Sequence, residues 1–283
     1  MPATIRLSMS GPHMLNPLEY GECLKGVVYK WLGLIAPDIH DLNQLKPVSI
    51  GPLRIGVSGR TEFELSILTD GVEASALMAA ASESQIWLQR ARSAPIRYQL
   101  ETIDVVAETI WSDLLSARDD TIGYPTRFCF ELTSPTAHHA RDRERDASSQ
   151  ERTVSGPRIR RSLVLPAPET YFNSWLTRWL LCCPLPIPDE MLELVKDRMV
   201  VSDCHGGTQT VRFKDRMVVG FVGNVCFEVL KPNQVPLHLL QYLNALSRFA
   251  EYCGTGVDTM CGMGRTVYMP CWNNPAPKKP YPL

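Results

Sequence analysis

The most informative part of the sequence is residues 237–269, which run LHLLQYLNALSRFAEY (237–252), CGTGVDTMCGMG (253–264) and RTVYM (265–269). Apolar residues recur every three to four positions in 237–252, which predicts an amphipathic helix. Residues 265–269 favour a short strand. Between them, Gly254, Gly256, Gly262 and Gly264 form a G-x-G-x5-G-x-G loop. Because glycine tolerates positive φ and close backbone approach, this loop can either expose amides to phosphate oxygens or form a tight structural turn.

The position of this loop argues against the common nucleotide-binding motifs. G-x-G-x-x-G and G-x4-G-K-[ST] loops follow a strand and precede a helix, whereas here the helix comes first and the lysine is missing. An enzyme that cradles a small phosphorylated substrate in this loop is therefore a weak alternative.

The whole second half has a regular order of elements. The pattern predicts strands at 127–133, 200–213, 216–229 and 265–269 and helices at 171–181 and 237–252, with breaks at Gly206-Gly207 and Lys214-Asp215. The first half predicts strands at 4–10, 47–57, 61–68 and 96–107 and helices at 17–35 and 71–90. The order β-α-β-β-α-β is ferredoxin-like, with two helices on one face of an antiparallel sheet. We therefore predict an α+β fold of two tandem ferredoxin-like (RRM-like) domains, residues 1–120 and 121–283.

The overall composition is that of a soluble globular protein. The 283 residues are 45% hydrophobic and 21% charged, with 29 Lys+Arg against 30 Asp+Glu and a net charge of −1. This balance argues against nonspecific coating of nucleic acid but leaves local basic patches open. No secretion signal and no apolar run long enough for a membrane span is evident, so we expect a cytoplasmic protein. The nine cysteines contain no Cys-x-x-Cys pair, and we expect them to be reduced and mostly buried.

One segment, residues 138–161, differs from the rest of the chain. It is rich in arginine and poor in large aliphatic residues, and it contains Gly156 and Pro157. Two interpretations stand about equal: a solvated hairpin loop, or an arm that holds RNA phosphates. The arginines that would make such contacts are Arg141, Arg143, Arg145, Arg158, Arg160 and Arg161.

Three stretches together resemble a known family. They are the glycine loop at 252–264, residues 130–137 (FELTSPTA), and residues 40–53 (HDLNQLKPVSIGPL). The last two are similar to the F…SPTAF and LHD…KPFTISPL elements of the CRISPR repeat-specific precursor-RNA endoribonucleases. These enzymes are the sixth CRISPR-associated protein, within the repeat-associated mysterious protein (RAMP) superfamily. The resemblance extends over nearly the whole chain and implies an RNA-binding endoribonuclease of antiviral defence.

The resemblance also implies a mechanism and its residues. The family cuts without metal: the 2′-hydroxyl attacks the adjacent phosphate, which leaves a 2′,3′-cyclic phosphate and a 5′-hydroxyl. We therefore expect neither a metal nor a cofactor. His40 fits the role of proton donor or acceptor, because imidazole titrates near neutrality. Lys46 fits the stabilisation of negative charge, and Tyr29 on the first helix is the candidate for the family's additional tyrosine. Without the family resemblance, both His40 and Lys46 would more simply be structural.

Two pairs of residues depart from the family pattern. Val257 and Asp258 stand where the family's loop carries a basic residue, and we expect a neighbour such as Arg265 to neutralise Asp258. His138 and His139 stand where the family has phenylalanine and a basic residue. We expect Arg265 and the loop glycines Gly254, Gly256, Gly262 and Gly264 to contact RNA.

The expected partners are CRISPR repeat RNA, its mature product (crRNA) and other CRISPR-associated subunits of an effector complex, and no membrane. The alternative function is a non-catalytic subunit that binds crRNA within such a complex.

Overall fold

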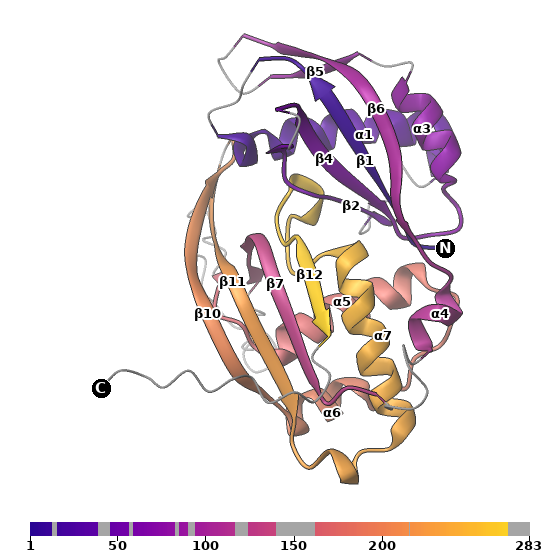
Figure 1. Cartoon of the computed structure of the whole chain (residues 1–283), viewed down its shortest axis with the longest axis vertical. Coiled ribbons are helices and arrows are strands. Elements are labelled where there is room, and N and C mark those ends of the chain that lie inside the picture. Colours follow the sequence, from indigo (N-terminus) through magenta and orange to yellow (C-terminus); the bar gives the residue numbers. More distant parts are fainter. Residues whose placement is uncertain are drawn as a thin grey trace, which may run out of the picture.

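The computed structural model describes residues 1–12, 16–38, 46–56, 59–82, 85–89, 94–116, 124–139, 162–214 and 216–270. The chain forms two α+β units stacked end to end, each with its own antiparallel sheet (Figure 1). The predicted boundary between residues 120 and 121 lies outside the described residues. Within the described residues, no helix is long and apolar enough to cross a membrane.

The first unit has the predicted ferredoxin-like strand order. Its sheet runs β2-β4-β1-β6-β5, with β3 paired beside β2 on β4. Without the added edge strand β5, the order of the remaining strands is that of a β-α-β-β-α-β unit. The strands are β1 (Ala3–Ser10), β2 (Val48–Ile50), β3 (Arg54–Ile55), β4 (Thr61–Ile67), β5 (Ile86–Leu88) and β6 (Ile96–Glu108).

Helices α1 (Gly21–Ile35) and α3 (Ala74–Ser82) cover one face of this sheet, and η1 (Pro17–Tyr20) leads into α1. Strand β1 alternates, with Ile5, Leu7 and Met9 in the core against Leu24, Val28, Trp31 and Leu32 of α1. Thr4, Arg6 and Ser8 point to the opposite face, and β4 places Glu62, Glu64 and Ser66 beside them. This polar face of the sheet is turned toward the second unit.

The second unit repeats the same topology. Its sheet runs β10-β11-β7-β12, which is again the ferredoxin-like order. The strands are β7 (Arg127–Thr136), β10 (Met199–Arg212), β11 (Met217–Val229) and β12 (Thr266–Pro270), and a separate pair is formed by β8 (His138–His139) and β9 (Ser162–Leu163). The helices are α5 (Pro168–Cys182), α6 (Met191–Arg198) and α7 (Leu237–Cys253), with η2 (Pro232–Gln234) and η3 (Thr259–Cys261).

The core of the second unit is built from aromatic side chains. Phe130 of β7 lies 4.9 Å from Trp175 of α5 and 5.9 Å from Phe227 of β11, ring centre to ring centre. Helix α4 (Trp111–Leu115), N-terminal to the predicted boundary, also packs here, with Trp111 5.7 Å from Trp179 and 5.7 Å from Phe249. Helix α4 is thereby part of the second core, although it precedes the predicted boundary.

Some predicted elements are wrong. The helix expected at 71–90 ends at Ser82, and Ile86–Leu88 form the edge strand β5 instead. There Ile86 and Leu88 are buried while Trp87 points out, where the Arg97 guanidinium of the paired strand lies 5.8 Å from its ring. The expected break at Gly206-Gly207 is also wrong, because β10 runs through it. Gly206 lies so close to β11 that a Cβ would come within 2.2 Å of the Val222 carbonyl oxygen, and glycine therefore permits the close pairing.

The expectation that all cysteines are reduced is wrong for one pair. Cys129 of β7 and Cys226 of β11 face one another in register and form a disulfide. Cys182, Cys253 and Cys261 are buried free thiols, and burial raises the pKa of each to about 12.

Candidate active site

The predicted catalytic residues Tyr29 and Lys46 lie in one pocket where the two units meet. The pocket has a volume of about 170 Å³. Helix α1 and the segment before β2 form one wall, and η3 of the second unit forms the other. Its lining residues are Lys25, Tyr29, Lys46, Arg178, Asp258, Thr259, Met260 and Cys261.

Lys46 is held in this pocket by its surroundings. Its side chain is only 8% exposed, and its Nζ lies 5.7 Å from the centre of the Tyr29 ring. The Lys25 Nζ lies 5.2 Å from the same ring. Both distances allow a cation–π attraction. Two ammonium groups beside one tyrosine make the pocket electropositive, which suits a phosphate. His40 lies outside the described residues, so its role stays a prediction.

The glycine loop is shaped by its glycines. All four have positive φ, between 68° and 82°. A Cβ on Gly256 would lie 2.2 Å from the Ala137 carbonyl oxygen, and a Cβ on Gly264 would lie 2.0 Å from the Thr255 carbonyl oxygen. The amide of Gly256 donates to Ser174 Oγ, that of Gly264 to the Pro135 carbonyl and that of Gly254 to the Ala250 carbonyl. The glycines thus make close packing possible, and these three amides are used inside the protein; direct contact of the loop with RNA stays a prediction.

The three stretches that suggested the family meet at this loop. From residues 130–137, Ala137 accepts a hydrogen bond from the Val257 amide, and Ser134 Oγ accepts one from the Arg265 amide. From residues 40–53, Pro52 packs against Gly262. Segments far apart in the sequence therefore converge to close one side of the pocket.

The acid in the loop is neutralised, though not by the expected neighbour. Asp258 accepts two hydrogen bonds of 2.7 Å from the Arg216 guanidinium, and this bidentate pair raises the pKa of Arg216. The expectation that Arg265 plays this part is wrong. The strand pairing of β10 and β11 places Arg216 at the hairpin end, next to the loop, and no sequence spacing signals that contact.

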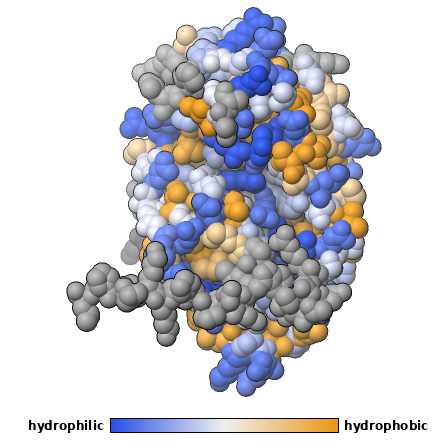
Figure 2. All heavy atoms as spheres, viewed as in Figure 1, coloured by the Kyte–Doolittle hydropathy of each residue, from blue (hydrophilic) through white to orange (hydrophobic). Residues whose placement is uncertain are grey.

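Arg265 instead joins the two units. Its guanidinium lies 2.6 Å from a carboxylate oxygen of Glu64 on β4 and also donates to the Glu251 carbonyl. Arg6 and Arg54 bind the same carboxylate at 2.9 and 2.8 Å. Burial opposes ionisation of Glu64, but the three arginines outweigh it and hold the pKa of this carboxyl below its ordinary value. Arg54 also lies 3.9 Å from Glu62, so two acids face the three arginines at this junction, and Figure 2 shows a hydrophilic band across this part of the surface.

The six arginines of the arm, Arg141, Arg143, Arg145, Arg158, Arg160 and Arg161, lie outside the described residues. The two ends of this segment are described: the chain leaves from β8 and returns in β9, beside the glycine loop. RNA contacts by these arginines stay a prediction.

Sequence reasoning missed one buried cation, Arg178 of α5. It is 5% exposed and lines the pocket beside Lys46, with its Nη2 donating to Thr259 Oγ1 at 2.6 Å. Burial lowers the pKa of its guanidinium. A signal was available, because residues 171, 175, 178 and 182 share one helical face and the other three are apolar or aromatic.

Comparison with solved structures supports the fold. Two structures of Cas6 in complex with a product are each 22% identical to this chain, with TM-scores of 0.73 and 0.71; each alignment covers 95% of this chain and 99% of the other. Thermus thermophilus Cas6 is 19% identical, with a TM-score of 0.66 and coverage of 95% and 98%. Comparison with curated proteins finds no match. The molecule thus has the tandem ferredoxin-like fold of these Cas6 structures.

A family model establishes more than the fold. The model of the CRISPR-associated endoribonuclease Cas6 matches residues 125–266, just over half of the chain. The chain belongs to this family, as the three sequence stretches indicated. It is an endoribonuclease of CRISPR RNA processing.

Proposed function

We propose that this enzyme cleaves CRISPR precursor RNA within its repeats by attack of a 2′-hydroxyl on the neighbouring phosphorus. The O2′–P bond forms and the P–O5′ bond breaks, which gives a 2′,3′-cyclic phosphate and a 5′-hydroxyl. A base takes the proton of the 2′-hydroxyl, and an acid returns one to the leaving 5′-oxygen. The step requires no metal. The observation that carries the proposal is the convergence of Lys46, Tyr29 and the glycine loop on one pocket.

Each residue has a part that follows from its chemistry. Lys46 is a buried ammonium, and it stabilises the negative charge that develops on the phosphate oxygens more strongly than it would in water. Tyr29 lies beside two ammonium groups and orients the phosphate or the attacking hydroxyl. His40, six residues before Lys46, transfers the proton.

RNA binding extends beyond this pocket. We assign phosphate contacts to the arginines of residues 141–161, whose segment starts and ends beside the glycine loop. Arg265 belongs to the charged junction around Glu64, where we assign it a further contact with RNA. We further propose that the product stays bound as crRNA and that the protein can hand it to other CRISPR-associated subunits. Sequencing of RNA that co-purifies with the protein tests this, because retention predicts fragments that end within one repeat and carry a cyclic phosphate.

Single-turnover cleavage of the cognate repeat RNA tests the chemistry. We expect cleavage in EDTA and none when the scissile nucleotide is 2′-deoxy. His40→Ala should slow cleavage by about 10²- to 10⁴-fold and Lys46→Ala by about 10²- to 10³-fold, both with RNA binding largely kept. Lys30→Ala is the matched control, because Lys30 is an exposed lysine of α1 outside the pocket. Wild-type rates for His40→Ala would remove His40 from the mechanism, and cleavage of the 2′-deoxy RNA would refute the proposed reaction.

A further inference from the structure

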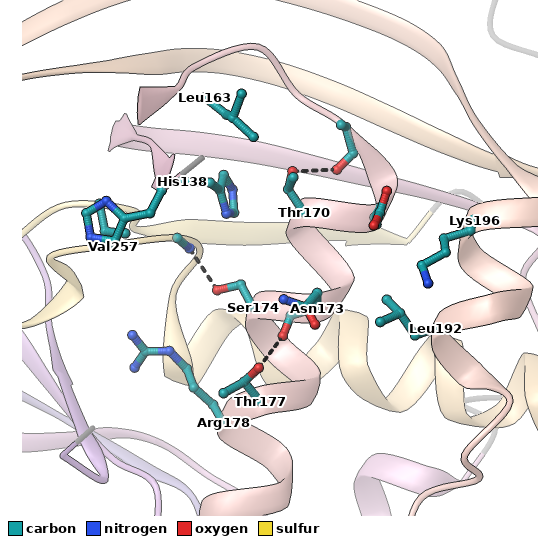
Figure 3. Close-up of a pocket in the computed structure, with 14 residues that line it drawn as sticks. His138, Leu163, Thr170, Asn173, Ser174, Thr177, Arg178, Leu192, Lys196 and Val257 are labelled. Atoms are coloured by element: carbon teal, nitrogen blue, oxygen red, sulfur yellow. Dashed lines mark hydrogen bonds between the residues drawn. The ribbon is translucent and has the colours of Figure 1, made fainter. Parts of the chain in front are cut away.

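A second, larger pocket lies on the other side of the glycine loop. Its volume is about 720 Å³, within the range of small-molecule sites. It is lined by strands β8 and β9, helices α5 and α6 and the loop residues Gly256 and Val257. Figure 3 shows His138 on one side of this pocket and Thr170, Asn173, Ser174 and Thr177 of α5 on the other. We call it the α5 pocket.

His138 is buried in the wall of the α5 pocket with an unused polar atom. Its side chain is 7% exposed, and its Nε2 has no hydrogen-bond partner among the described residues. Its ring packs against Tyr171 of α5, with the ring centres 5.0 Å apart. Burial, and to a lesser degree His139, lowers the pKa of His138 to about 4. The imidazole is therefore neutral at pH 7, with one N–H donor and one acceptor nitrogen. A buried polar atom without a partner costs free energy unless a ligand satisfies it.

Helix α5 faces this imidazole with a row of polar side chains. Thr170 Oγ1 donates to the Ala167 carbonyl and Thr177 Oγ1 to the Asn173 carbonyl, at 2.9 and 2.7 Å, so their oxygens still accept hydrogen bonds (Figure 3). The Asn173 side-chain amide makes no hydrogen bond within the described part of the chain. An asparagine amide matches the edge of a base that carries an amine beside a ring nitrogen. Leu163, Leu192 and Val257 add apolar surface on which a flat ring can lie.

Arg178 connects the α5 pocket with the active-site pocket. It lines both pockets, and no acidic side chain of the described residues lies within 4 Å of it. Asp258, which lines the active-site pocket together with Arg178, is already bound by Arg216. A buried cation without a counter-charge favours an anion. The glycine loop also borders both pockets, with Gly256 and Val257 on one side and Asp258 to Cys261 on the other.

We propose that the α5 pocket binds an unpaired nucleobase of the RNA, next to the phosphate that is cut, with Arg178 holding a phosphate between the two pockets. The inference rests on the proposed function and deepens it by naming a nucleotide subsite. The base bears an amine beside a ring nitrogen, as adenine and cytosine do, and it is recognised by Asn173 and His138. Proteins read single-stranded RNA in this way, with splayed bases stacked and hydrogen-bonded on their edges.

Binding of a series of repeat RNAs tests the subsite. Each RNA has a 2′-deoxy group at the scissile nucleotide, to block cleavage, and one abasic nucleotide near the cut. For the wild-type protein, we expect one abasic position to weaken binding about ten-fold. Asn173→Ala should bind the intact RNA about ten-fold more weakly and lose the sensitivity to that abasic position. Asn233→Ala, a change at an exposed asparagine that lines neither pocket, is the control.

The role of Arg178 has its own measurement, the dependence of affinity on salt. Arg178→Met should lower the slope of log affinity against log salt concentration by about 0.7, the value for one phosphate contact to a single strand. A purely structural arginine would leave that slope unchanged. If the wild-type protein binds every abasic RNA as tightly as the intact RNA, the subsite is refuted, even if the unmodified repeat is cleaved normally. Tight binding without any cleavage of the unmodified repeat would instead refute the proposed function, and the abasic series would still decide the subsite.

Discussion

The two units have the same topology but different interiors. In the first, α1 packs aliphatic residues such as Leu24 and Val28 on β1. In the second, Tyr171, Phe172, Trp175 and Trp179 of α5 pack against the phenylalanines of β7 and β11. The first unit also gives the uncovered face of its sheet to the contact between units, whereas the second contributes the glycine loop. One fold used twice has therefore specialised, with one copy contributing Lys46 and Tyr29 and the other contributing the loop and Arg178.

The contact between the units depends on few polar groups. Ser49 Oγ donates to the Tyr252 carbonyl at 2.5 Å, and the Lys214 amide donates to Glu22 at 3.1 Å. The largest cluster is Glu64 with Arg265, Arg6 and Arg54. Because Arg265 immediately follows the glycine loop, the Glu64 cluster fixes the loop against the first unit.

The largest expected effect comes from breaking this cluster. Glu64 is 6% exposed, and Glu64→Gln removes the buried charge that Arg265, Arg6 and Arg54 share, although Arg54 still lies 3.9 Å from Glu62. We expect the free energy of unfolding, measured with urea, to fall by about 3–5 kcal/mol. Glu101→Gln is the matched control, because it removes a surface pair with Arg60 that is worth at most about 1 kcal/mol.

The same cluster predicts a dependence on pH. The pKa of Glu64 is lower in the folded protein than the ordinary value of 4.5. Its contribution to stability is therefore complete above pH 4.5 and is lost as the pH falls through the folded value. Equal acid sensitivity of wild type and Glu64→Gln would contradict this account.

The second-largest expected effect is a loss of stability at low pH that is caused by His138 in the second unit. The pKa of His138 is about 4 in the folded protein against 6.5 ordinarily, so the unfolded chain binds the proton more readily between these values. Stability should be complete above pH 6.5 and fall by up to about 3 kcal/mol on going to pH 4. His138→Phe should remove this part of the pH dependence in urea unfolding, whereas His205→Ala, at a histidine whose side chain is 71% exposed, should not. A wild-type profile for His138→Phe would show that His138 is not the titrating group.

The sequence predicted the topology well because the long elements carry strong periodic patterns. In the helix at 237–252 and in the strands at 127–133 and 216–229, the spacing of the apolar residues fits only one kind of secondary structure. The edge strand β5 was missed because its three residues follow an alanine-rich helix without a breaker. Whether a short edge strand forms depends on the strand with which it pairs, here β6, and local sequence patterns do not identify that strand.

The candidate site was only partly predictable for a related reason. Lys46 and the glycine loop were found because they belong to motifs with fixed spacing. Arg178 and Arg216 belong to no motif; they reach the loop through the packing of α5 and the pairing of β10 with β11. The bond between Cys129 and Cys226 likewise depends on strand register. Contacts of this kind follow from tertiary structure, which the sequence specifies only as a whole.

The smallest expected effect is that of a substitution at Gly26 of helix α1. Gly26 is exposed in the middle of the helix, and a Cβ there would meet no atom within 4 Å. Gly26→Ala should therefore stabilise the protein by about 0.5–1 kcal/mol in urea unfolding and leave cleavage unchanged.

Gly21 begins the same helix, but its Cβ would lie 1.9 Å from the Cys261 carbonyl oxygen of η3. Gly21→Ala should push the glycine loop away from α1 and slow cleavage, because the loop closes the pocket around Lys46. If both alanines stabilised the protein and spared cleavage, the close contact of α1 with the loop would not be needed to form the site.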